Sequence, residues 1–141
     1  MGTLKWLDGM SVGIKEMDDD HIAMFDTLSN IHDALGAADT AKAQALCEEL
    51  YDMSKIHGAK EEAFLRLHEF PGIDKVLMVQ MNTITGIEDL ASIIAKGDAP
   101  KAIEKVDDMQ ERFIDYMLRG DINYKSFVFE HDLEFVDGEG I

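Results

Sequence analysis

His57 and Glu61, one helical turn apart in the stretch HGAKE, are the first candidates for chemistry in this sequence. Residues at positions i and i+4 of a helix lie on the same face, one above the other. An imidazole and a carboxylate placed in this way can bind one metal ion, or they can form an ion pair with each other. Because helices carry many such pairs by chance, the spacing alone favours the ion pair.

His21 and Asp121 have the same chemical character and fall where helices of the predicted fold would bring them inward. His21 opens the apolar stripe of the first predicted helix, and Asp121 follows Gly120 at the end of the last. Ionisable groups in a core are unfavourable unless they are paired or bound to metal. Two imidazoles and two carboxylates that face one core suit iron, manganese or zinc. The alternative is a set of His–carboxylate pairs between helices.

Apolar residues recur with the period of an α-helix along most of the chain. The period predicts four helices, over about residues 18–36, 40–69, 73–96 and 99–119. Their inward positions are Met24, Phe25, Leu28, Ile31 and Leu35; Ala43, Leu46, Leu50, Met53 and Phe64; Val76, Thr83, Ile87, Leu90 and Ile94; and Ile103, Val106, Phe113 and Met117. The residues 18–20, all Asp, supply an N-cap and an acidic first turn for the first helix.

Helices of this length joined by short loops predict an all-α fold, an antiparallel up-down four-helix bundle with an N-terminal arm and a short C-terminal tail. The sequence contains no internal repeat or low-complexity tract, so we expect residues 1–141 to form a single domain. The tail SFVFEHDLEFVDGEGI alternates apolar and acidic residues. This pattern leaves open a short strand, a strap and a frayed end.

The composition excludes several classes of partner. The chain has 29 acidic and 13 basic residues and a net charge of −16 at pH 7. Such a surface repels phosphate backbones and anionic lipids, so we expect neither nucleic acid nor membrane as a partner. No secretory signal is visible, and no apolar run approaches the ~20 residues that span a bilayer. The single cysteine, Cys47, excludes an internal disulfide, and we expect a cytoplasmic protein.

Four spaced segments of the chain follow one known pattern. WLDGMSVGIKEMDDDH ends on a candidate ligand histidine, HGAKE supplies an HxxxE motif, FPGIDKVLMVQ follows a helix break, and YMLRGD ends on an aspartate that Tyr124 follows three residues later. Through these segments the chain resembles the bacterial hemerythrins, without a gap, from Trp6 to about Phe127. The resemblance implies that the metal ligands are His21, His57, Glu61 and Asp121.

The chain departs from the hemerythrin pattern at Val76, Gln80 and Tyr116, where the family has the three histidines of one of its two irons. The resemblance therefore implies a metal site with fewer ligands than in the family. Such a site would be mononuclear rather than diiron and would bind iron or another divalent metal. Val76 cannot bind metal. We expect the neutral Tyr116 hydroxyl to reach the carboxylate of Glu61 or Asp121, directly or through one water, and the alternative is a phenolate ligand.

Three classes of function follow. The first is a non-enzymatic hemerythrin-like protein that binds or senses a small ligand such as O2 or NO. The second is a metal-free helical bundle that serves as an interaction or signalling module for an unidentified protein partner. The third is a mononuclear iron oxygenase, because such enzymes use two histidines and one carboxylate with open positions. We place it last, because the sequence shows no obvious substrate pocket or cosubstrate motif.

Overall fold

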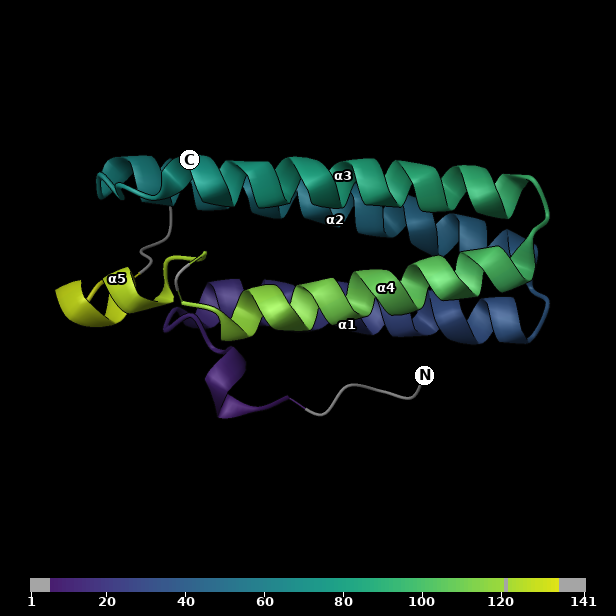
Figure 1. The fold of residues 1–141 in the computed structure, drawn as a ribbon, viewed down its shortest axis with the longest axis horizontal. Coiled ribbons are helices and arrows are strands. Elements are labelled where there is room, and N and C mark those ends of the chain that lie inside the picture. Colours follow the sequence, from purple (N-terminus) through teal and green to yellow (C-terminus); the bar gives the residue numbers. More distant parts are fainter. Residues whose placement is uncertain (1–5, 121, 135–141) are drawn as a thin grey trace.

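The computed structural model describes residues 6–120 and 122–134, which form helices and no strand. The long helices run alongside one another (Figure 1). The four long helices are α1 (Lys15–Gly36), α2 (Thr40–Leu67), α3 (Ile73–Ala95) and α4 (Ala99–Leu118). Two shorter helices are η1 (Asp8–Met10, a 3-10 helix) and α5 (Lys125–His131). The four predicted helices are therefore present, with ends that differ from the predicted ones by at most three residues.

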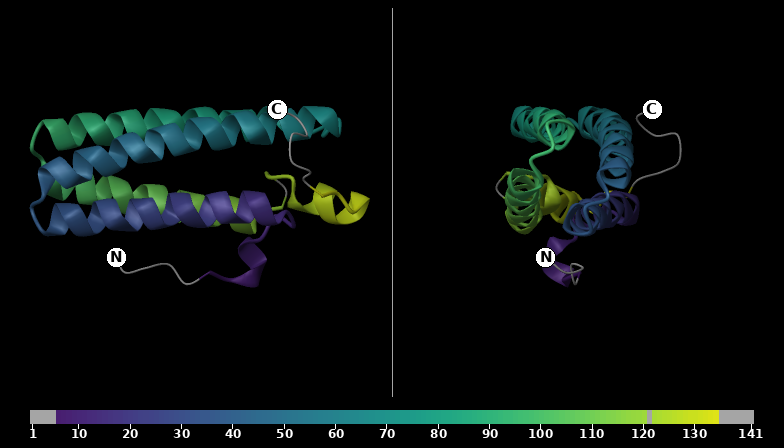
Figure 2. Two further views of the ribbon diagram at one scale, coloured as in Figure 1. Left: turned by 180° about the vertical axis from the view of Figure 1, so that it is seen from behind. Right: turned by 90° about the vertical axis from the view of Figure 1, so that its right-hand side faces the viewer.

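Each of the four long helices packs against two of the others. Helix α1 contacts α2 and α4, and α3 contacts the same two helices. Seen along the long axis of the molecule, the four helices lie at the corners of a rough square (Figure 2). This arrangement is compatible with the predicted antiparallel up-down bundle.

The predicted apolar stripes line the interior, and each of their residues is buried or partly buried. One core cluster lies toward the end of the helices where α1 joins α2 and α3 joins α4, and it includes Leu28, Leu50, Ile87 and Val106. A second cluster joins the segment before α1 to α2, α3 and the segment after α4; it contains Val12, Ile14, Met17, Phe64, Leu65, Val76, Tyr124 and Val128. Along α2, the ionisable residues of HGAKE fall between these two clusters.

The start of α1 corrects one prediction. The helix begins at Lys15, and its N-cap residue, Ile14, makes no side-chain cap hydrogen bond. Asp18 lies in the first turn and reaches back instead, accepting hydrogen bonds from the Val12 amide at 2.9 Å and the Ser11 hydroxyl at 2.5 Å. A first-turn carboxylate often bonds the chain that precedes its helix in this way. The acidic run therefore fixes the N-terminal segment and does not cap the helix.

The C-terminal tail, which the sequence left undecided, forms α5 over part of its length. Val128 of α5 is buried in the second core cluster. The predicted tail beyond residue 134 lies outside the described residues. None of the helices in the described part of the chain has both the length and the apolar composition that a membrane-spanning segment needs.

Candidate metal centre

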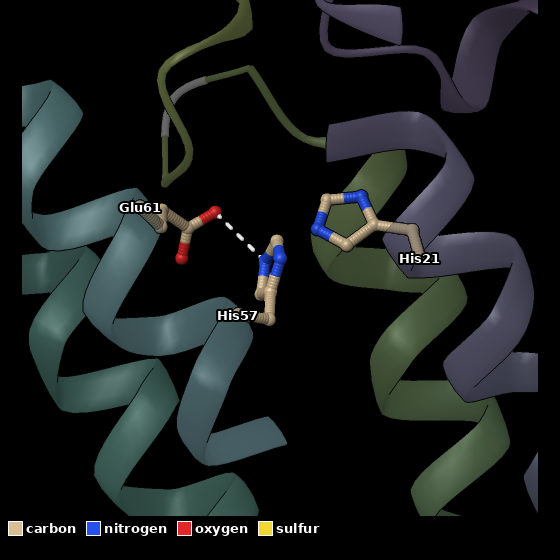
Figure 3. Close-up of side chains that lie close together, drawn as sticks. All are labelled: His21, His57 and Glu61. Atoms are coloured by element: carbon tan, nitrogen blue, oxygen red, sulfur yellow. Dashed lines mark ion pairs between the residues drawn. The ribbon is translucent and has the colours of Figure 1, made fainter. Parts of the chain in front are cut away.

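Three predicted ligands meet in the interior of the protein. His21 comes from α1, His57 and Glu61 come from α2, and the side chains point toward one another (Figure 3). All three are buried, and one ligand atom from each lies within 4.8 Å of the others. Two atoms bound to one metal at ~2.1 Å lie at most ~4.2 Å apart. Small side-chain rotations would therefore bring the three residues, which we call the triad, into metal-binding geometry.

Asp20 orients the His57 ring. The Nδ1 atom of His57 lies 2.8 Å from Oδ2 of Asp20, and its Nε2 atom lies 3.3 Å from Oε2 of Glu61. The same Asp20 oxygen lies 2.8 Å from the Lys60 ammonium group. When Nδ1–H donates to Asp20, Nε2 faces the centre of the triad. Metal-binding histidines are commonly held by a carboxylate in this way.

Two neutral side chains hold the Glu61 carboxylate. The Tyr124 hydroxyl donates to Oε2 at 2.5 Å, and the Gln80 amide donates to Oε1 at 2.8 Å. Gln80 also donates to the Gly58 carbonyl of α2 at 3.2 Å. Both oxygens of the carboxylate therefore have protein donors, and its orientation is fixed from α3 and from the segment after α4.

Burial and mutual charge set the protonation of the metal-free triad. Burial alone would lower the pKa of His57, but the Glu61 charge and the Asp20 hydrogen bond raise it to about 9. Burial alone would raise the pKa of Glu61, but the His57 cation and the hydrogen bonds lower it to about 2. Burial, together with the His57 charge, lowers the pKa of His21 to about 4. His57 is thus cationic, Glu61 anionic and His21 neutral at pH 7.

The neutral His21 ring is a suitable metal ligand. Its Nδ1 atom is buried and has no hydrogen-bond partner among the described residues. The ring packs edge-on against His57, with ring centroids 4.8 Å apart, and against Phe113 of α4 at 5.5 Å. Histidine binds metal as the neutral imidazole, so no proton has to be removed from His21 before it can bind a metal ion.

The three positions at which the hemerythrin pattern has histidines differ in their surroundings. Val76 is fully buried and packs in the second core cluster. Gln80 holds the Glu61 carboxylate through its amide group. The Tyr116 hydroxyl is buried and has no hydrogen-bond partner among the described residues. The predicted direct bond from Tyr116 to Glu61 is therefore wrong, and Tyr124 and Gln80 donate to the two oxygens instead.

Tyr116 keeps its proton. Burial and the nearby Glu61 charge raise the pKa of its hydroxyl well above the ordinary value. The hydroxyl is therefore neutral in the metal-free protein. Asp121, the fourth predicted ligand, lies outside the described residues, and its predicted role stays a prediction.

A cavity of about 310 Å³ adjoins the triad. His21, His57 and Glu61 belong to its lining, and the remainder comes from all four long helices and from Ile122 after α4. Phe113, Tyr116 and Ile122 lie along the α4 side. A ligand that enters this cavity can thus reach the triad.

The sequence did not predict Asp20 and Tyr124 as partners of the triad. Asp20 precedes His21 in the acidic run, where its charge suggested a helix end, and Tyr124 stood out only as part of the resemblance.

A scan against protein-family models and a search of curated proteins find no match to this chain. The function therefore has to be inferred from the residues of the site.

Proposed function

We propose that this chain is a hemerythrin-like, non-enzymatic metal protein that binds one metal ion and a small ligand such as O2 or NO. In this proposal the four long helices form an antiparallel up-down bundle. The metal is iron, held by His21, His57 and Glu61, with Asp121 as the candidate fourth ligand.

The buried triad carries the proposal. Two imidazoles and a carboxylate suit iron, manganese or zinc, and three protein ligands leave positions open for a small molecule. Iron bound there would supply an open coordination position and one-electron redox chemistry. Asp20 and Tyr124 support the proposal because they hold His57 and Glu61 in fixed orientations, as the outer partners of metal ligands do.

The residues that stand in place of the three family histidines favour one bound metal ion rather than two. Val76 offers no donor atom, the Gln80 amide is engaged by Glu61 and the Gly58 carbonyl, and Tyr116 keeps its proton. Binding of O2 as peroxide, as in the family, takes two electrons from two irons. We therefore propose sensing or binding of a small ligand rather than reversible O2 carriage.

Titration with NO tests this function. The protein is loaded anaerobically with ferrous iron, and NO is added while the absorption spectrum is followed. We expect saturable uptake of one NO per bound iron, and loss of uptake in the His57→Ala variant. The His131→Ala variant is the matched control, because His131 lies in α5, outside the triad. Iron binding without NO uptake would overturn the ligand-binding function.

A metal-free interaction module is the second candidate, and the charge balance of the triad favours it. His57 lies between Asp20 and Glu61, and Lys60 pairs with Asp20, so two cations balance the two carboxylates without a metal. In this candidate the bundle binds a protein partner and the triad only stabilises the fold. Iron that fails to bind at the triad would support it.

A further inference from the structure

The cavity beside the triad is larger than a diatomic ligand needs. Its volume is about 310 Å³, whereas one water molecule occupies about 30 Å³ in the liquid. It falls at the lower end of the roughly 300–1,000 Å³ that small-molecule pockets have. The space fits a molecule of about ten non-hydrogen atoms.

The middle of the cavity is apolar. Leu28, Ile87 and Met109 contribute to its walls from α1, α3 and α4. Gly86 of α3 is also part of the lining and leaves space, because a Cβ atom there would meet only the Met109 side chain, at 3.7 Å. Apolar walls of this kind favour an apolar ligand body.

Two buried hydroxyl groups belong to residues that line the cavity and lack partners. Neither the Ser54 hydroxyl nor the Tyr116 hydroxyl has a hydrogen-bond partner among the described residues. A buried polar group without a partner is unfavourable, because it has lost its hydrogen bonds to water. A ligand oxygen at the inner end of the cavity would give these groups a partner.

The outer part of the lining is cationic. Lys105 and Arg112 of α4 belong to it, and Arg112 is exposed to solvent. Asp108 lies between them in the sequence and pairs with Arg112, its Oδ2 atom 2.9 Å from Nε. These three residues carry one net positive charge on a chain whose net charge is −16. The excess positive charge favours an anionic group at this end.

We propose that this cavity binds a small organic carboxylate that also carries a hydroxyl group at its far end. The carboxylate pairs with Lys105 and Arg112, the apolar chain occupies the space beside Gly86, and the hydroxyl group bonds Ser54 or Tyr116. The binding site is formed by the protein alone, so it goes beyond the proposed metal function and does not depend on it.

Calorimetric titration of the whole chain with 8-hydroxyoctanoate tests the proposal. The titration is run on the protein as purified and repeated after dialysis against a chelator, so a failure to bind metal leaves the result intact. We expect saturable binding in the micromolar range in both samples. Octanoate lacks the inner hydroxyl and should bind roughly fivefold more weakly, as expected for one lost hydrogen bond. Absence of binding, or equal binding of 8-amino-1-octanol, would overturn the proposal.

Two matched pairs of variants locate the site. Gly86→Leu fills the cavity with several carbon atoms and should weaken binding by roughly thirtyfold or more, from the transfer free energy of the displaced methylene groups. Gly36→Leu is its control, because nothing lies within 4 Å of a Cβ atom at that helix position. Wild-type affinity in a folded Gly86→Leu protein would contradict the assignment.

The second pair tests the charged end and does not alter the core. Lys105→Glu should weaken binding roughly fivefold or more, whereas Lys101→Glu, an exposed residue of α4 outside the cavity lining, should leave affinity unchanged. Equal effects of the two changes would show that only the overall charge of the protein matters, and would exclude Lys105 as the partner of the carboxylate.

Discussion

Glu61 is held by more polar partners than the other residues of the triad. His57, Tyr124 and Gln80 contact its two oxygens, and the side chain is 3 % exposed. A buried carboxylate with this many donors is stable as the anion. It is therefore ready to bind a divalent metal ion without first losing a proton.

Tyr124 and Tyr116 form a matched pair for testing this arrangement. Tyr124→Phe removes a hydrogen bond to a buried charge and should reduce the free energy of unfolding by about 1.5–3 kcal/mol. Tyr116→Phe removes a hydroxyl that has no partner among the described residues, and should change stability by less than about 1 kcal/mol in either direction. Urea denaturation of both variants checks this, and a larger loss in Tyr116→Phe would contradict the contacts described.

The folding stability of the metal-free protein depends on pH through His57. Its pKa is about 9 in the folded protein and 6.5 when unperturbed, so the folded state binds more protons between these values. The contribution of His57 to stability is fully present below pH 6.5 and is lost as the pH rises through 9. The loss is roughly 3–4 kcal/mol at most, at about 1.4 kcal/mol per pKa unit.

Urea denaturation in the presence of a chelator, between pH 6 and 10, measures this loss. The His57→Gln variant should lack the decrease that the wild type shows, and His131→Gln should retain it. Parallel curves for the wild type and His57→Gln would mean that the imidazole is not cationic in the folded protein.

Only part of the site could be predicted from single residues. His21, His57 and Glu61 stood out because imidazoles and a carboxylate on apolar stripes are costly without a partner. Asp20 and Tyr124 could not be assigned as their partners, because Asp20 reaches from α1 to α2 and Tyr124 comes from the segment after α4. Such contacts depend on how the helices pack, which periodicity does not specify.

At the scale of the helices, local rules explain most of the structure. The Asp39 and Asp98 side chains accept hydrogen bonds from the Lys42 and Lys101 amides at 3.1 and 3.2 Å, and so cap α2 and α4. The apolar period was sufficient to predict the four helices, and these caps explain where α2 and α4 begin. Helix α1 starts earlier than predicted, since its first turn is anchored by the preceding segment rather than by a cap.

Gly86 and Gly97 test how glycine acts within and after a helix. Gly86 lies inside α3, where alanine has room and is more favourable, so Gly86→Ala should stabilise the protein by about 0.5–1 kcal/mol. Gly97 follows α3 with φ +78°, so Gly97→Ala should destabilise it by roughly 1–2 kcal/mol. Thermal or urea denaturation distinguishes the two, and effects of the same sign would contradict this explanation.

At the scale of the whole molecule, the triad is assembled from parts that are distant in the sequence. Helix α1 supplies His21, α2 supplies His57 and Glu61, and the segment after α4 supplies Tyr124, which is buried with the residues that precede α1. A metal ion bound by the triad would join α1 to α2. Binding to the folded state alone stabilises that state, so metal should raise the unfolding temperature of the wild type.

The metal content of the purified protein is the most direct test of the central claim. Elemental analysis of protein from iron-supplemented cells should give close to one metal ion per chain, and close to none in His21→Ala and His57→Ala. The His131→Ala variant should match the wild type. Two metal ions per chain would show that Gln80 or Tyr116 helps to bind a second ion, contrary to a mononuclear site. Absence of metal from a folded wild-type protein would contradict the metal-binding function itself.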